Sequence, residues 1–128
     1  MTVVTTALAT ILLVEDDSLL RHAFKLLLED AGYRIHEAGT AHEAIERSRE
    51  EAPDLVLLDL GLPDAPGLDV ARTLRLNEST QETPIIALTG RVGADEKREC
   101  IEAGCTSYLT KPIEPRELIR RLGEFLKA

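Results

Sequence analysis

The sequence predicts a single α/β domain in which a doubly wound parallel sheet carries helices on both faces. Short apolar runs alternate with amphipathic segments along the chain, and three of these runs, ILLV, LVLL and IIAL, contain no polar residue. Strands that are apolar throughout are typical of a parallel sheet covered on both sides. The chain has 128 residues, which fits one domain that folds without disulfides.

The first strand is expected at 10–14, where the run TILLV stands. A helix is expected over 18–31, because its leucines, alanines and phenylalanine recur at helical spacing, with Asp17 as its N-cap and Gly32 at its end. Residues 33–38 read YRIHEA, which is half polar and fits an edge strand better than a central one.

The next helix is expected over 40–51. Thr40 is a candidate N-cap and Glu43 follows three residues later, which is a capping-box pattern. Pro53 ends this helix, because proline cannot continue it. The strand DLVLLD at 54–59 is apolar up to its final aspartate and is expected at the centre of the sheet.

The second half of the chain continues the alternation. Gly104 marks the end of one helix and Pro115 lies in the first turn of the last one. The strand PIIALT is expected at the centre of the sheet, and the shorter SYLT at an edge. The expected elements are a helix near 68–77, a strand at 84–89, a helix at 95–103, a strand at 107–110 and a helix at 114–128.

The formal net charge of −8 argues against a nucleic-acid or anionic-membrane surface and favours a divalent cation or a basic partner. No apolar run approaches the roughly 18 residues that a membrane span needs. Residues 1–9, MTVVTTALA, lack the basic start of a signal peptide, and we expect a flexible leader there. Cys100 and Cys105 are too few for a disulfide framework, so we expect reduced thiols and a cytoplasmic location.

Polar residues follow four of the strands where each one ends. Glu15 and Asp16 follow the first strand, Asp59 ends the third, Thr89 the fourth, and Lys111 follows the fifth. In doubly wound sheets, ligands bind outside these carboxyl ends. Crowded carboxylates suit Mg²⁺, while an ammonium, a hydroxyl donor and a carboxylate nucleophile are the parts that phosphoryl transfer needs.

From about residue 10 to 126, the chain resembles the receiver domains of response regulators in two-component signalling. The motifs ILLVEDD, DLVLLDLGLPD, PIIALTG and YLTKP stand in the family's order, and the spacings of 30 positions from Asp59 to Thr89 and 22 from Thr89 to Lys111 are the family's own. The resemblance implies a flavodoxin-like fold over 10–128, with strand order 2-1-3-4-5 and five helices. It further implies a cytoplasmic phosphoacceptor of a two-component system or phosphorelay, which assists its own phosphorylation and dephosphorylation and is not an enzyme.

The resemblance also assigns the acidic residues. Asp59 would be the phosphoacceptor, receiving a phosphoryl group from a phosphohistidine on a partner. Asp16 would bind Mg²⁺ directly, Glu15 through water, and Gly61 through its backbone carbonyl, with Asp59 completing the metal site. The small side chain of Gly61 leaves space for a bulky phosphodonor.

The remaining roles come from the resemblance in the same way. Lys111 would hold one phosphoryl oxygen and the Thr89 hydroxyl another. Tyr108 would turn inward once Thr89 moves, and the bond from Lys111 to Pro112 would be cis. The fourth helix, fifth strand and fifth helix would form the output surface.

The first helix has more apolar residues than its core face requires. One interpretation is a wider core face, and the other is a docking surface for a histidine kinase or a histidine phosphotransfer domain. The residues of this expected docking surface are Leu19, Leu20, Ala23, Leu26 and Ile113.

Three other functions compete with this interpretation. An aspartate-nucleophile phosphatase would need an aspartate where Gly61 stands, and a flavin or nucleotide site would need a Gly/Ser/Thr-rich first loop where Glu15, Asp16 and Asp17 stand. The sequence does not exclude a third hypothesis, a degenerate receiver that only binds other proteins. It also leaves two settings for the domain undecided: a free-standing receiver, or one excised from a hybrid kinase or longer regulator.

Overall fold

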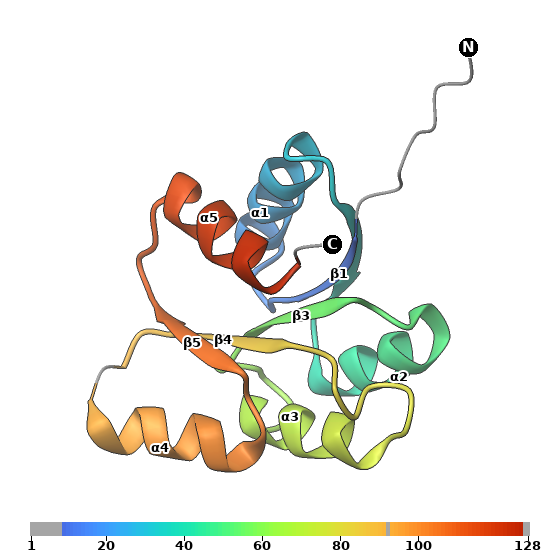
Figure 1. The fold of residues 1–128 in the computed structure, drawn as a ribbon, viewed down its shortest axis with the longest axis vertical. Coiled ribbons are helices and arrows are strands. Elements are labelled where there is room, and N and C mark those ends of the chain that lie inside the picture. The colour runs from blue at the N-terminus through green and yellow to red at the C-terminus, as the bar shows by residue number, and fades with distance from the viewer. Residues whose placement is uncertain (1–8, 92, 127–128) are drawn as a thin grey trace.

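A computed structural model describes residues 9–91 and 93–126 (Figure 1). The expected leader at 1–9 therefore lies outside the described residues, except for Ala9, whose carbonyl accepts a 3.1 Å hydrogen bond from the Arg34 N–H. Among the residues described, no helix combines the length and the apolar character needed to cross a lipid bilayer.

Five parallel strands form one sheet in the order β2-β1-β3-β4-β5, as expected. The three fully apolar runs are β1, β3 and β4 and lie at the centre, while the two half-polar segments are the edge strands β2 and β5. The strands are β1 (Thr10–Val14), β2 (Arg34–Ala38), β3 (Leu55–Asp59), β4 (Ile85–Thr89) and β5 (Ser107–Thr110).

The helices cover both faces of the sheet, with α1 and α5 on one side and α2, α3 and α4 on the other (Figure 1). Alternation along each strand supplies both layers. Leu12 and Val14 pack in the layer of α2, α3 and α4, whereas Ile11 and Leu13 pack in that of α1 and α5. The helices are α1 (Ser18–Asp30), α2 (Ala41–Glu51), α3 (Gly67–Leu76), α4 (Ala94–Ala103) and α5 (Pro115–Phe125).

The expected helix caps are confirmed at the starts of α1 and α2. The Asp17 carboxylate accepts from the N–H groups of Leu19 and Leu20 at 3.0 and 3.2 Å. The Thr40 hydroxyl accepts from the Glu43 N–H at 3.1 Å, but the Glu43 carboxylate reaches past Thr40 and accepts from the Gly39 N–H, also at 3.1 Å. The second hydrogen bond of the capping box is therefore made with the N–H of Gly39, one residue before the N-cap, and not with that of Thr40 as the pattern predicts.

Two helix ends differ in detail from the expectation. The last turn of α2 is closed by Ala52 in the left-handed region, with φ 43°, so the helix has already ended before Pro53. The expected helix over 114–128 ends at Phe125, where no basic side chain in the last turn complements the helix dipole. Residues 127–128 of that expectation lie outside the described residues.

The two cysteines are buried free thiols at the C-terminal end of α4. Burial raises the pKa of the Cys105 thiol to about 12 and also raises the pKa of Cys100. Protonated, buried thiols behave as small apolar side chains. Both belong to the core rather than to a reactive site.

Leu57 and Leu76 form a matched pair for testing where stability resides. Leu57 of β3 is fully buried between the sheet and the layer of α1 and α5, whereas Leu76 at the end of α3 is 86% exposed. We expect Leu57→Ala to lower the free energy of unfolding by about 2–5 kcal/mol, because it leaves a cavity. Leu76→Ala should change it by about 0.5 kcal/mol or less. Urea unfolding measures both, and equal effects would contradict this core assignment.

Candidate functional site

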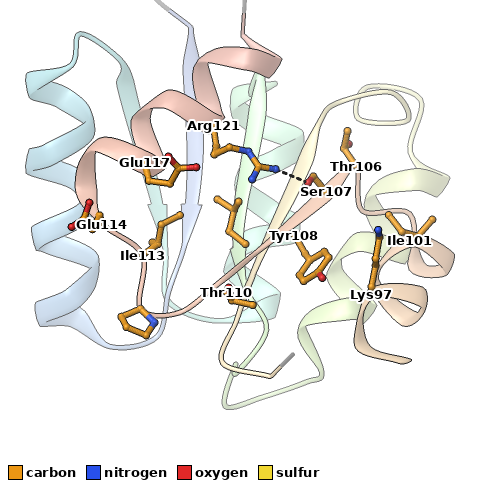
Figure 2. A pocket seen from close by; sticks show the side chains of 12 residues that line it. Lys97, Ile101, Thr106, Ser107, Tyr108, Thr110, Ile113, Glu114, Glu117 and Arg121 are labelled. Carbon is orange, nitrogen blue, oxygen red and sulfur yellow. Dashed lines mark hydrogen bonds between the residues drawn. The ribbon is translucent and has the colours of Figure 1, made fainter. Parts of the chain in front are cut away.

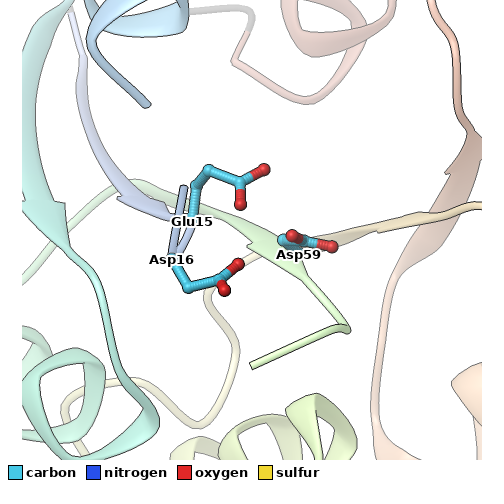
Figure 3. Close-up of side chains that lie close together, drawn as sticks. All are labelled: Glu15, Asp16 and Asp59. Carbon is cyan, nitrogen blue, oxygen red and sulfur yellow. The ribbon is translucent and has the colours of Figure 1, made fainter. Parts of the chain in front are cut away.

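Three carboxylates converge where β1 and β3 end. The two strands are neighbours, with Val14 opposite Leu58, so the next residues, Glu15 and Asp59, lie side by side at the same edge. Oxygens of Glu15, Asp16 and Asp59 lie within 4.8 Å of one another (Figure 3). Glu15 and Asp59 are buried and Asp16 is exposed, so the cluster opens to solvent on one side.

Lys111 supplies the positive charge of this cluster. Its Nζ lies 2.8 Å from Asp59 Oδ1 and 3.7 Å from Glu15 Oε1. The Lys111 N–H donates to the Thr89 carbonyl at 2.8 Å, which continues the pairing of β5 with β4. The Lys111–Pro112 peptide bond is cis, as the resemblance implies.

The protonation states follow from burial and from this ammonium. Burial raises the pKa of Glu15 to about 7, and the hydrogen bond and charge of Asp59 add to the rise. Burial alone would raise the pKa of Asp59 as well, but hydrogen bonds with Lys111, Glu15 and the Gly61 N–H lower it overall. Asp59 is thus the ionised member of the pair, and the pKa of Lys111 is raised by its contact with Asp59 despite burial.

The donor set fits a hard divalent cation. Within residues 9–91 and 93–126, the buried Glu15 Oε1 has no hydrogen-bond partner, although a buried carboxylate oxygen normally has one. A cation among the three carboxylates would satisfy that oxygen and cancel their mutual repulsion. Oxygen ligands, few of them charged and one side open to water, match the preference of Mg²⁺.

Gly61 lies beside the buried aspartate and leaves the space next to it open. Its N–H donates to Asp59 Oδ1 at 3.2 Å. A Cβ built on Gly61 would meet only Asp59 Oδ1, at 4.0 Å. An incoming group can therefore approach the carboxylate from this side without displacing a side chain.

Arg21 was not predicted as a site residue, yet it supports the acidic loop. Its guanidinium donates to the Glu15 carbonyl at 2.7 Å and to the Glu37 carboxylate at 3.2 Å. The Asp17 N–H donates to Glu15 Oε2 at 3.1 Å. An arginine one turn into a helix carries no distinctive sequence signal, because its partners are a backbone carbonyl and a residue of another strand.

Thr89 lies at the end of β4, but its hydroxyl points to α4. It donates to Glu96 Oε1 at 3.2 Å and accepts from the Arg91 N–H at 3.1 Å. Tyr108, on β5, is half-buried against the layer of α2, α3 and α4. Of the five residues expected at this edge, Glu15, Asp16 and Asp59 bring their carboxylates together and Lys111 contacts two of them. Thr89 adjoins the cluster through its backbone, which accepts from the Lys111 N–H.

The apolar residues of α1 are divided between core and surface. Leu28 is buried and Phe24 packs against the core, whereas Leu19 is 80% exposed and Leu26 is 53% exposed. Leu20 and Ala23 are exposed too, and Ile113 is half-buried. The interpretation as a wider core face is therefore wrong for Leu19, Leu20, Ala23 and Leu26. They are exposed apolar side chains on α1, which begins just after Glu15 and Asp16 of the acidic cluster.

The raised pKa of Glu15 predicts a pH dependence for the metal-free protein. Between the unfolded value of 4.5 and the folded value of about 7, the folded state holds a proton that the unfolded chain has lost. The contribution of Glu15 is thus full below pH 4.5 and is lost as the pH rises through 7. In chelator, unfolding free energies at about pH 5 and about pH 8 should differ more for wild type than for Glu15→Gln, by up to about 3 kcal/mol. Identical pH dependence in both proteins would contradict this assignment.

Comparison with known proteins agrees with this geometry. The family model of the response regulator receiver domain matches residues 11–123. The chain is 41% identical over 118 residues to the phosphate regulon transcriptional regulatory protein PhoB of Pseudomonas aeruginosa, covering 92% of this chain and 52% of PhoB. It is 38% identical over 117 residues to the transcriptional regulatory protein PhoP of Escherichia coli, covering 91% and 52%. The chain thus spans about half the length of these relatives.

Solved structures show the same fold. The chemotaxis protein CheY4 of Vibrio cholerae superposes with a TM-score of 0.90 at 29% identity, covering 94% of this chain and all of that one. The receiver domain of the sensor histidine kinase PA1611 of Pseudomonas aeruginosa, with a magnesium ion in its active-site cleft, gives 0.87 at 31%, covering 95% and 100%. Fold, acidic cluster and family model agree, and the chain belongs to the response regulator receiver domains, the phosphoacceptor modules of two-component signalling.

Proposed function

We propose that Asp59 is the residue of this receiver domain that accepts the phosphoryl group. The observation that carries the proposal is the ion pair of Asp59 with Lys111 inside the carboxylate cluster. Asp59 is ionised, and the space beside Gly61 is open. A carboxylate oxygen of Asp59 would attack the phosphorus of a phosphohistidine, the N–P bond would break, and the imidazole would leave with the electron pair.

The residues around Asp59 would share the charge of the transferred group. Mg²⁺ held by Glu15, Asp16, Asp59 and the Gly61 carbonyl would supply positive charge opposite the phosphoryl oxygens. Lys111 already contacts Asp59 and would keep its ammonium on one phosphoryl oxygen. These groups would assist both phosphorylation and loss of the phosphate, so the domain would act as a signalling switch rather than as an enzyme on a separate substrate.

The switch would pass from Thr89 to the face formed by α4, β5 and α5. A phosphoryl group on Asp59 would draw the Thr89 hydroxyl toward it, and Tyr108 would move inward into the space left behind. A groove of about 730 Å³ lies on this face, and Tyr108 contributes to its lining (Figure 2). Charged side chains surround it, including Lys97 and Arg121, the latter donating to Ser107 Oγ at 3.4 Å. An output partner or a further region of a longer protein would bind here.

The apolar surface beside the acidic cluster would bind the phosphodonor. Exposed leucines on α1 suit a helix of a histidine kinase or histidine phosphotransfer domain, because apolar faces of helices pack together. Docking there would bring the phosphohistidine to the open side of the cluster. With such a partner, the domain expected over residues 10–128 would act in the cytoplasm, and two free thiols would suit that compartment.

Phosphorylation by a small acyl phosphate tests the function directly. In Mg²⁺, we expect intact mass spectrometry to show one added phosphoryl group on the wild type. Asp59→Ala and excess chelator should each abolish it, because one removes the nucleophile and the other the charge that stabilises transfer.

Asp64→Ala is the matched control for this experiment. Asp64 is a nearby acid that caps α2 by accepting from the N–H groups of Ala41 and His42, so it lies outside the cluster. This variant should still gain the phosphoryl group. A gain that persists in Asp59→Ala would overturn the assignment of the acceptor.

Leucine-to-glutamate variants test the docking surface. We expect Leu19→Glu and Leu26→Glu to slow transfer from a phosphorylated histidine phosphotransfer domain that is active on wild type, by about tenfold or more, because a charge enters an apolar contact. Phosphorylation by the small acyl phosphate should stay unchanged. Leu76→Glu is the control, because Leu76 on α3 is at least as exposed as either leucine of α1. Equal slowing by Leu76→Glu would argue against α1 as the docking site.

A further inference from the structure

The Thr89 hydroxyl is hydrogen-bonded to a side chain outside the carboxylate cluster. Its oxygen lies 3.2 Å from Glu96 Oε1 and 3.5 Å from the Arg91 carbonyl, and it accepts from the Arg91 N–H at 3.1 Å. A hydroxyl has one proton to donate. The nearer and charged acceptor is Glu96, and hydrogen bonds to charged groups are the stronger ones.

Glu96 is also the side chain that ties the start of α4 to the sheet. Among residues 93–99, it alone is not exposed, and its side chain is only 11% accessible. The helix begins at Ala94, and its N-cap residue is Gly93, so within the described residues no side chain caps it. Arg91 Nε lies 3.9 Å from the other carboxylate oxygen of Glu96 but is largely solvated, so that pair contributes little.

The other end of α4 is held much more firmly. Cys100 and Ala103 are buried in the core. Arg75 donates to the carbonyl of Gly104 at 2.9 Å, to the carbonyl of Thr80 at 3.0 Å and to the hydroxyl of Thr106 at 3.4 Å. A Cβ on Gly104, which has φ 107°, would lie 2.6 Å from the Arg75 Cγ, so the contact is close. Motion of α4 is therefore easiest at its first two turns.

We propose that Glu96 is a positioning residue that holds the Thr89 hydroxyl toward α4 and competes for it with a phosphoryl group on Asp59. The competition rests on the proposed function of Asp59. When Thr89 donates to a phosphoryl oxygen, Glu96 loses its partner, and a carboxylate so little exposed must then move to water. The first turns of α4 are released while Arg75 keeps the far end in place.

Asp95 provides a control that separates this role from a general effect of helix charge. It occupies the same first turn, carries the same charge and is 81% exposed, with Arg98 as its partner. Both acids interact favourably with the helix N-terminus. Of these two acids, Glu96 is the one that hydrogen-bonds the Thr89 hydroxyl within the described part of the chain.

Hydrogen exchange tests the contact without metal or phosphodonor. We expect Glu96→Ala to speed exchange of the amides of residues 97–100 by about tenfold, because a charge-assisted hydrogen bond is lost. Thr89→Val should do the same, and the double variant should add nothing further. Asp95→Ala should give an effect at least about threefold smaller. Two outcomes would contradict the contact between Glu96 and Thr89. One is that Asp95→Ala speeds the exchange as much as Glu96→Ala does, and the other is that the effects of Glu96→Ala and Thr89→Val add up in the double variant.

Binding of beryllium fluoride, a phosphoryl mimic, in Mg²⁺ tests the competition. Glu96→Ala should bind it about three- to tenfold more tightly than wild type, because Thr89 is free to donate. Glu96→Gln, which keeps an uncharged acceptor, should be intermediate. Asp95→Ala should match wild type, and the gain should vanish in a Thr89→Val background. A merely structural role for Glu96 would weaken binding instead.

The outcomes distinguish the two proposals. A wild type that binds the mimic while Glu96→Ala binds it no more tightly overturns the role of Glu96 alone. The role of Glu96 is likewise overturned if Glu96→Ala still tightens binding of the mimic in the Thr89→Val background. A wild type that neither binds the mimic nor gains a phosphoryl group counts against Asp59 as the acceptor, and the competition then fails with it.

Discussion

The balance between Glu15, Asp59 and Lys111 is the interaction on which the site depends. Two buried carboxylates side by side would repel each other if both were ionised. The ammonium of Lys111, 2.8 Å from Asp59, keeps that carboxylate ionised. The pKa of Glu15 is raised instead, so Glu15 holds a proton more readily and repels Asp59 less. The result is a carboxylate that is charged, buried and adjacent to a place for a cation.

This balance requires the winding of the sheet. Because β1 and β3 are neighbours, Glu15 and Asp59 leave the sheet at the same point, although 44 positions separate them in the chain. Lys111 follows the edge strand β5 and reaches the cluster past β4, with its backbone bonded to Thr89. The same bond places Thr89 between the cluster and α4. Asp59 is therefore linked to the exposed start of α4 by a short series of contacts, through Lys111 and Thr89 to Glu96.

Much of this arrangement could be predicted from local patterns. Alternating apolar runs indicated the strands and separated central from edge positions, and Asp17 and Thr40 marked helix starts correctly. The acids and the lysine could be placed at one edge because carboxyl ends of parallel strands meet there. The motifs around Asp59, Thr89 and Lys111 then pointed to the family. Details at helix ends, such as Ala52 in the left-handed region, were beyond a pattern of residue types.

By itself, the sequence determined the order of the elements, the apolar faces and the identity of the groups at the strand ends, because these depend on neighbours along the chain. Only the tertiary structure decided which partner each polar group has. Arg21 beneath Glu15, Arg75 at Gly104 and Glu96 on Thr89 are contacts between separate elements. Their geometry depends on how helices pack on the sheet, and a side chain's choice among several acceptors follows from distance and burial.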